Sequence, residues 1–256
     1  TNQYQFYRSY VDPSSVYWDV SLNLNLDFNI MGLISYDSTY ASSANDMKKI
    51  APVEAYLPWT FNIQDNNVMN LVSTKYAIVT NETQVPFEYF EKVGEFNYLS
   101  VYENKDYVNL GKTYSNAISY DEYDGNTDIL KESLVVYQED LSEIQSYLGN
   151  TENTFNTVIR KQNSLYAEIT TDENEFVLLS IPYDKGWTIT VNGNEINPYR
   201  VSGGLMGLPL EKGNNVIQMN FIPYGLKIGI VTTLVGVILL FLVSILKLKR
   251  NQIKKH

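Results

Sequence analysis

The feature that most constrains the fold is an apolar run at residues 228–246, which contains no charged residue. At about 1.5 Å per residue, a helix of this length measures roughly 28 Å, close to the thickness of the hydrocarbon core of a bilayer. A buried helix of a soluble protein is the alternative, but such a helix normally carries a polar face and this run has none. We therefore predict one transmembrane helix over residues 225–247, followed by a basic tail at residues 248–256.

Charged residues beside the apolar run predict its orientation. Lys247, Lys249 and Arg250 follow it directly, and basic flanks normally stay on the cytoplasmic side of a membrane. We therefore expect residues 1–224 outside the cell and the C-terminus inside. Tyr224 and Lys227 precede the run and are expected, together with the three basic residues after it, to anchor the helix at the membrane surfaces.

The charge of the outer part excludes several classes of function. All 29 acidic residues precede Lys227, whereas six of the 19 basic residues lie at or after it, which leaves 13 basic residues and a net charge of −16 before the helix. Such an acidic surface repels nucleic acid, which we exclude as a partner. Cysteine is absent and the only histidine is His256. Thiol catalysis, a hydrolase triad and a zinc site are therefore excluded as well.

Residues 1–150 mix helical and strand patterns, which predicts an α+β region. Asp140 stands three residues before Glu143, and Gly149 follows the apolar stripe, so we predict an amphipathic helix capped by Asp140. The other elements expected here are strands at residues 20–28, 76–79 and 96–102, helices at residues 42–50 (ended by Pro52) and 68–72, and a turn at residues 103–106.

Residues 151–224 show short strand patterns separated by turn residues, which predicts a β-sandwich. Leu165, Ala167 and Ile169 alternate with polar residues, as in a half-buried strand, and residues 176–181 form a continuous apolar run. Because the last strand leads into the apolar helix, we expect the sandwich to lie against the membrane surface. Further strands are expected at residues 187–191, 205–210 and 216–221.

Turn residues separate these strands. Asn192 and Gly193 favour the positive φ angles of a tight hairpin. Gly186 and Gly213 are likewise predicted to be turn residues with positive φ, since neither belongs to a phosphate-binding loop motif.

The C-terminal half carries a recognisable order of motifs. Residues 180–187 have the sequence SIPYDKGW, and they are followed by VNG at residues 191–193, SGG at residues 202–204 and FIP at residues 221–223. This order resembles the ending of the outer domain in the bacterial YfhO-like membrane proteins. Weaker similarities are FYR at residues 6–8, SYDS at residues 35–38, LVSTKYAIV at residues 71–79 with its KY pair at residues 75–76, and VYEN at residues 101–104. The resemblance identifies the chain as a C-terminal portion of such a protein.

The resemblance implies a polytopic bacterial cell-membrane protein related to the GT-C glycosyltransferases. Such a protein would transfer a sugar from a polyprenyl-phosphate donor to a cell-surface polymer such as lipoteichoic acid. The other membrane helices and the acidic residue expected to perform the chemistry would lie outside this chain. We therefore expect no catalytic residue and no cofactor within it, and the expected partners are the bilayer, the upstream helices and a surface glycan.

One loop is rich in potential metal ligands. Asp121, Asp124, Asn126 and Asp128 supply the oxygen atoms that calcium prefers. A calcium loop needs alternating ligands and a glycine at its sixth position, but Gly125 falls one place early when the count starts at Asp121. We predict a solvated acidic turn, with calcium binding as the alternative.

Trp187 can be a core residue or a sugar platform. It alternates with Ile189 and Val191, which places it on the face expected to form the sandwich core. An exposed indole ring would instead stack on a sugar. We predict the core position. The glycan contacts expected on neighbouring loops are Tyr183, Asp184 and Tyr199, with Trp187 as the alternative contact.

Two hypotheses of function belong to different classes. The first is the outer, C-terminal part of a polytopic glycosyltransferase, and the second is a single-pass, surface-displayed carbohydrate- or wall-binding module without catalysis. A third, a free-standing glycosidase, requires two carboxylates at a defined separation in a cleft. The chain starts at Thr1 without an apolar leader, so we expect a processed chain or a piece of a longer one. Apolar spans upstream would favour the first hypothesis, and a signal peptide directly before Thr1 the second.

Overall fold

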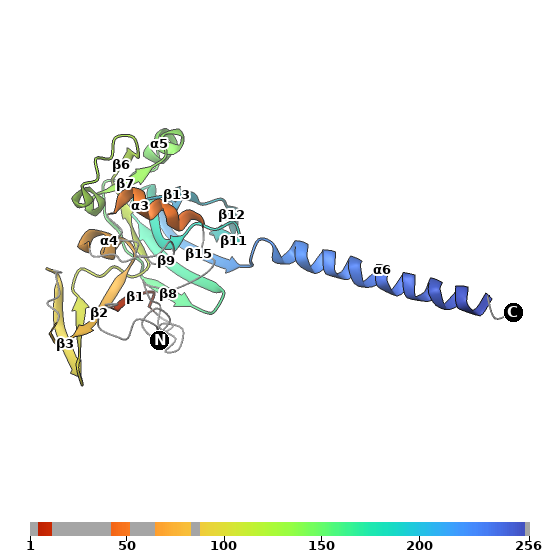
Figure 1. The fold of residues 1–256 in the computed structure, drawn as a ribbon. Coiled ribbons are helices and arrows are strands. Elements are labelled where there is room, and N and C mark those ends of the chain that lie inside the picture. Colours follow the sequence, from red (N-terminus) through yellow and green to blue (C-terminus); the bar gives the residue numbers. More distant parts are fainter. Residues whose placement is uncertain (1–4, 12–41, 52–64, 83–87, 254–256) are drawn as a thin grey trace.

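The computed structural model describes residues 5–11, 42–51, 65–82 and 88–253 (Figure 1). The strand predicted at residues 20–28 and the helix-ending Pro52 lie outside these ranges. Within them, the strands form a four-stranded first sheet, a four-stranded second sheet, a five-stranded third sheet and a two-stranded ribbon.

The first sheet has the strand order β1-β2-β4-β3. Its strands are β1 (Arg8–Val11), β2 (Thr74–Thr80), β3 (Phe90–Phe96) and β4 (Leu99–Asn104). The strand predicted at residues 96–102 is confirmed at residues 99–102, which belong to β4, but it does not begin at Phe96, because Asn97 adopts a φ of 53° and turns the chain between β3 and β4. The turn predicted at residues 103–106 begins too early, since Asn104 still belongs to β4 and donates from Nδ2 to the carbonyl oxygen of Thr74.

The second and third sheets are antiparallel throughout. The second sheet, ordered β13-β14-β10-β5, contains β5 (Gly111–Tyr114), β10 (Glu175–Pro182), β13 (Tyr199–Val201) and β14 (Leu205–Leu210). The third sheet, ordered β12-β11-β15-β9-β8, contains β8 (Thr157–Arg160), β9 (Ser164–Thr171), β11 (Trp187–Val191), β12 (Asn194–Ile196) and β15 (Gly213–Phe221).

These two sheets face each other across one apolar cluster. Leu165, Ala167 and Ile169 of β9 are buried in it together with Val177 and Leu179 of β10. The alternation that predicted a half-buried strand at residues 165–169 is therefore confirmed. The second sheet also contains β5, which lies before residue 151. The division into one domain at residues 1–150 and another at residues 151–224 stays a prediction.

β10 is buried on both faces because the second sheet separates two cores. Phe176 and Leu178 point into a second cluster, away from Val177 and Leu179. This arrangement explains the continuous apolar run at residues 176–181, since neither face of the strand meets water. The second cluster is completed by α3 (Met47–Ile50), α4 (Asn66–Leu71), α5 (Gln138–Gln145) and the parallel ribbon of β6 (Asn116–Ser119) and β7 (Ser133–Val136).

Helices form where the sequence predicted them, with one error at a helix start. The short helix at residues 42–50 consists of the 3₁₀-helix η2 (Ser42–Asp46) followed by α3. The cap predicted at Asp140 is wrong, because β7 ends at Val136 and Tyr137 already stands at the N-cap of α5 with an extended backbone. Asp140 therefore lies in the first turn of the helix, where burial raises the pKa of its carboxyl group.

The predicted tight hairpin is confirmed. Asn192 and Gly193 connect β11 to β12 with φ angles of 52° and 83°. Gly213, at the start of β15, has the predicted positive φ, at 111°.

The last element, α6 (Leu226–Ile253), extends away from the rest of the chain (Figure 1). Its segment Ile228–Ile245 is long and apolar enough to cross a membrane, and none of it is buried against the rest of the chain. The hydroxyl groups of Thr232 and Ser244 donate to carbonyl oxygens one turn earlier, at 3.0 and 2.8 Å, so they need no water. The predicted fold class, an α+β region with a C-terminal β-sandwich followed by one membrane-spanning helix, is confirmed within the described residues: strands dominate the region before α6, and the one C-terminal apolar helix could span a membrane.

Candidate functional site

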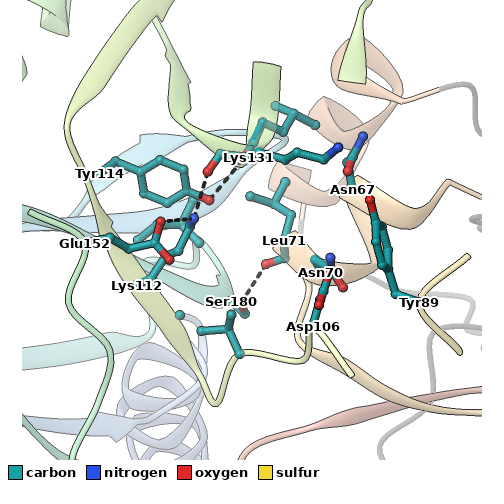
Figure 2. Close-up of a pocket in the computed structure, with 14 residues that line it drawn as sticks. Asn67, Asn70, Leu71, Tyr89, Asp106, Lys112, Tyr114, Lys131, Glu152 and Ser180 are labelled. Atoms are coloured by element: carbon teal, nitrogen blue, oxygen red, sulfur yellow. Dashed lines mark hydrogen bonds and ion pairs between the residues drawn. The ribbon is translucent and has the colours of Figure 1, made fainter. Parts of the chain in front are cut away.

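A cavity of about 400 Å³ with a mixed polar and apolar lining lies where the second sheet meets α4 and the 3₁₀-helix η3 (Thr127–Lys131). Its volume is within the range of small-molecule sites. Figure 2 shows Lys112, Tyr114 and Glu152 on one side of it, with Asn67 and Tyr89 across from them. The remaining lining residues are Asn70, Leu71, Asp106, Val108, Gly111, Leu130, Lys131, Leu178 and Ser180.

One side chain joins the two helices that border the cavity. The Oδ1 atom of Asp65 accepts from the amide of Val68 and caps α4, while its Oδ2 atom accepts from the hydroxyl of Thr127 at 2.7 Å. The starts of α4 and η3 are thereby held together. This contact fixes the separation of Asn67, on α4, from Lys131, at the end of η3.

Lys112 of β5 supplies a fixed positive charge at the cavity wall. Its Nζ atom lies 2.6 Å from Oε2 of Glu152, donates to the carbonyl oxygen of Lys131 at 2.7 Å, and lies 4.9 Å from the centre of the Tyr114 ring. Only 16% of the Lys112 side chain is exposed. With a carboxylate, a carbonyl and an aromatic face around it, the ammonium group has a defined position.

The opposite wall offers amide groups. The Nδ2 atom of Asn67 donates to Asp128, whereas its Oδ1 atom is buried and accepts no hydrogen bond from the residues that the structure describes. Asn70 accepts from Asn104 at 2.6 Å through Oδ1. A buried acceptor without a donor costs free energy, so a ligand hydroxyl that donates to Asn67 would be favoured.

The chemistry of the lining favours a neutral polyhydroxylated ligand. Amides, a carboxylate and an ammonium group can exchange donors and acceptors with hydroxyl groups, and tyrosine rings can pack on apolar C–H faces. Burial raises the pKa of Tyr114 above its ordinary value, so its hydroxyl stays protonated and donates to the carbonyl oxygen of Leu130. None of the described Asp, Glu or His residues form a group of three that could hold a metal ion.

The side chains of the predicted calcium loop form separate local contacts. Asp124 accepts from the amide of Asn126, and Asn126 caps η3 by accepting from the amide of Asp128. Asp128 pairs with Lys131 at 3.1 Å, and this hydrogen bond lowers the pKa of the Asp128 carboxyl group. Asp121 is exposed in the turn before them. The loop is organised by these caps, as expected of a solvated acidic turn.

The predicted glycan contacts do not gather in one place. Tyr183 and Asp184 lie on the loop between β10 and β11, where Asp184 accepts from the amide of Gly186 at 2.7 Å. Tyr199 instead packs on Phe176 in the second cluster, with ring centres 5.6 Å apart. The four predicted residues therefore do not form a single surface.

Trp187 lies at the margin of the cluster between the facing sheets. It is partly exposed, whereas Ile189 on the same face is fully buried. The indole ring packs against Phe221 of β15 with ring centres 5.0 Å apart. Trp187 thus contributes to the core with one face and retains exposed surface on the other.

Gly186 is a turn residue, as predicted, but its φ is not positive, so the turn does not use the left-handed conformation that glycine permits. A Cβ atom at this position would instead lie 2.6 Å from the carbonyl oxygen of Ile222. The glycine is needed for close approach of two backbone segments.

The predicted membrane anchors belong to α6 and to the residues just before it. Tyr224 is 68% exposed in the short segment between β15 and α6. Lys227, Lys247, Lys249 and Arg250 belong to α6 itself, but their side chains lie outside the described part.

The cavity residues form no sequence motif, so hydrophobic periodicity and motif spacing do not identify them. Asn67, Lys112, Glu152 and Ser180 come from four separate elements or loops. Only Ser180 belongs to a motif singled out in the sequence, and its hydroxyl donates to the carbonyl oxygen of Leu71, so its role there is to hold β10 to α4.

Residues 124–233 match the sequence profile of the family described as "Bacterial membrane protein YfhO". A relative, "Uncharacterized protein YfhO" of Bacillus subtilis (strain 168), is 23% identical over 108 residues. That alignment covers 42% of this chain and 12% of the relative, so the chain spans a small part of the relative's length. The matched range includes η3, both facing sheets except β5, and the first part of α6. The chain therefore carries, at residues 124–233, a YfhO-like bacterial membrane protein region.

Proposed function

We propose that this chain is the extracytoplasmic, C-terminal part of a polytopic YfhO-like membrane protein that glycosylates a cell-surface polymer such as lipoteichoic acid. The sugar donor is a polyprenyl-phosphate-linked sugar. The catalytic carboxylate belongs to the part of the protein outside this chain, as the family resemblance implies. The role of this chain is to bind the acceptor polymer beside the membrane.

The observation that carries this proposal is the cavity between α4 and the second sheet. Its free acceptor on Asn67, its fixed ammonium group on Lys112 and its tyrosine rings suit a polyhydroxylated chain. The lining holds two lysines, Lys112 and Lys131, and two acidic residues, Asp106 and Glu152, so its formal charges balance, as suits the neutral sugar units of such a polymer. The family match supports the membrane setting in which such an acceptor is found.

The acceptor role is tested by binding. The chain, in detergent micelles, is titrated with purified lipoteichoic acid in a calorimeter, and the variant Asn67→Ala/Tyr89→Ala is compared with the parent. Loss of one hydrogen bond and one aromatic contact should weaken binding about tenfold or more. Asn194→Ala, on an exposed strand of the third sheet, is the matched control and should bind like the parent. Equal affinity of the double variant would refute the assignment of the cavity.

The orientation is tested separately. Protease added to intact cells should remove the region before Tyr224 and leave a tag at His256 intact, since basic flanks stay cytoplasmic. Removal of the tag from outside would reverse the proposed topology.

The single-pass binding module is the competing function, and transfer activity separates the two. The full-length protein, supplied with a polyprenyl-phosphate sugar and lipoteichoic acid, should transfer sugar, and the Asn67→Ala/Tyr89→Ala change in it should reduce transfer. This chain alone should show no transfer. Binding without transfer by the full-length protein would favour the module.

A further inference from the structure

One end of the facing sheets is tied to the segment that leads into α6. The turn between β8 and β9 and the loop between β10 and β11 lie on the two sides of the end of β15. Asn163, in the turn, accepts from the amide of Phe221 at 2.8 Å, and Gly186, in the loop, accepts from the amide of Ile222 at 2.9 Å. These backbone hydrogen bonds fix both connections relative to the start of the helix.

The connection from β15 to α6 is too short to separate this end from the membrane. β15 ends at Phe221 and α6 begins at Leu226, so four residues join them. Four extended residues span at most about 14 Å. Two of these residues, Ile222 and Tyr224, are exposed in the outer region. With α6 in a bilayer, both connections therefore lie within reach of the lipid headgroups.

The charge at this end is opposite to that of the outer region as a whole. Arg160 and Lys161 lie at the turn between β8 and β9, and Lys185 lies on the loop between β10 and β11. At the opposite ends of the same strands the exposed turns carry Asp172 and Glu211. The end of the facing sheets near α6 thus carries three cations, whereas the opposite turns carry Asp172 and Glu211 beside one lysine, Lys212.

These cations are not used for ion pairs in the fold. Lysines that pair with a carboxylate are Lys49, Lys75, Lys92, Lys105, Lys112 and Lys131. Lys161 and Lys185 are exposed and have no carboxylate within ion-pair distance in the ranges described. The Nε atom of Arg160 is buried and, among those same residues, has no hydrogen-bond partner. The two exposed lysines are available to an external anion, and Arg160 adds its positive charge beside Lys161.

We propose that Arg160, Lys161 and Lys185 form a basic rim that binds the phosphate groups of anionic membrane lipids. The rim docks the facing sheets on the bilayer surface and sets their tilt relative to α6. Lipid is the occupant because the four-residue connection places this end at the headgroups and because the rim and an anionic surface are complementary in charge. Asp184, which accepts from the amide of Gly186 and lies beside Lys185, places one negative charge next to the three cations, so the rim keeps a net positive charge.

The test uses the chain with α6 in vesicles. Because the chain contains no cysteine, one introduced cysteine can be labelled at a single site. A fluorophore is placed on Gln162→Cys, in the turn beside Lys161, or on Asn194→Cys, on β12 at the far end of the hairpin from the rim. Vesicles of phosphatidylcholine, with or without phosphatidylglycerol, carry a quencher on their lipid headgroups.

We expect stronger quenching at Gln162→Cys when phosphatidylglycerol is present, and little change at Asn194→Cys. A cation near an anionic surface contributes about 1 kcal/mol, which corresponds to about fivefold in the equilibrium constant for docking. Because Lys161→Gln/Lys185→Gln removes two cations, it should lower that constant roughly twenty-five-fold. Lys212→Gln is the matched control, because Lys212 is an exposed lysine without an ion pair in the described part and lies at the opposite end. It should leave the quenching unchanged.

Salt supplies an independent measurement, since a Debye length of about 3 Å at 1 M screens surface charges. High salt should reduce the quenching of the parent to the level of the double variant. Equal quenching in neutral and anionic vesicles, or full quenching in the double variant, would overturn the proposal. The result does not depend on which side of the membrane the outer region occupies or on glycan binding, so the rim can fail while the proposed function stands.

Discussion

Gly186 and Ile222 are in direct backbone contact. The amide of Ile222 donates to the carbonyl oxygen of Gly186 at 2.9 Å, and a Cβ atom on Gly186 would lie 2.6 Å from the carbonyl oxygen of Ile222. Gly186 is the last residue before β11, and Ile222 is the first after β15. The contact therefore joins the loop before β11 to the chain that continues into α6.

We predict that Gly186→Ala destabilises the outer region by about 1 to 3 kcal/mol, because the new methyl group meets backbone atoms that cannot move independently. Gly94→Ala is the control, since a Cβ atom at Gly94 meets no other atom within 4 Å. Chemical denaturation in detergent micelles, followed by circular dichroism, gives both free energies of unfolding. Equal stability of the Gly186 variant and the parent would contradict the close approach.

A second prediction concerns Trp187, which packs on Phe221 but keeps part of its surface exposed. Trp187→Ala should cost about 2 to 3 kcal/mol, less than the 3 to 5 typical of a fully buried aromatic residue. Trp187→Phe should be milder, and Thr188→Ala, at an exposed neighbour, should change the stability by less than about 0.5 kcal/mol. Melting curves of the three variants check this order. An unchanged melting temperature for Trp187→Ala, with loss of polymer binding, would assign the ring to the ligand instead.

A third prediction concerns the guanidinium group that links the first and second sheets. The Nη1 atom of Arg8, on β1, donates to the carbonyl oxygens of Val72 and Ser180 at 2.6 and 2.8 Å. Burial lowers the pKa of Arg8 to about 10, so the group is still charged at neutral pH. Arg8→Met should cost about 3 kcal/mol, because two carbonyl groups lose a charged donor.

Two further variants make this measurement specific. Arg8→Lys should be intermediate, since an ammonium group is compact and cannot match the fork of guanidinium donors. Tyr7→Phe, which keeps the ring contact with Tyr76, is the control and should unfold close to the parent value. An Arg8→Met protein as stable as the control would show that the two sheets are held together by other contacts.

The sequence predicts those strands and turns whose conformation depends on residues close together in the chain. The alternation of Leu165, Ala167 and Ile169 identified β9, and the Asn192-Gly193 pair identified the hairpin, because both features are set within a few residues. The pairing of β5 with β10 joins residues more than 60 positions apart and leaves no local pattern. For the same reason, sequence alone did not indicate that β10 separates two cores.

The candidate cavity could not be predicted from the sequence either, because its residues are far apart in the chain. Asn67 and Lys112 meet there only because α4 packs beside the second sheet, and polar residues without a shared spacing give no motif. Gly186 illustrates a subtler limit, because a glycine that permits positive φ and one that permits close approach look identical in sequence. The charge difference between the two ends of the facing sheets also emerges only once the turns are assigned to an end.

The last prediction tests the position of Asp140 in the first turn of α5. Burial, followed by the charges of Glu139 and Glu143, raises the pKa of Asp140 above its ordinary value of 3.8. The folded state therefore binds the proton more tightly than the unfolded state, and Asp140 lowers the stability progressively as the pH rises through its folded pKa. Asp140→Asn should be more stable than the parent at pH 7, and this advantage should disappear below pH values of about 3.8. Free energies of unfolding measured across this pH range check the sign.

The variant Asp140→Ala tests whether Asp140 is the N-cap of α5. Replacing an N-cap aspartate by alanine would lower the free energy of unfolding by about 1 kcal/mol, whereas the same change inside the first turn should not. A loss of that size at pH 7 would restore Asp140 as the cap.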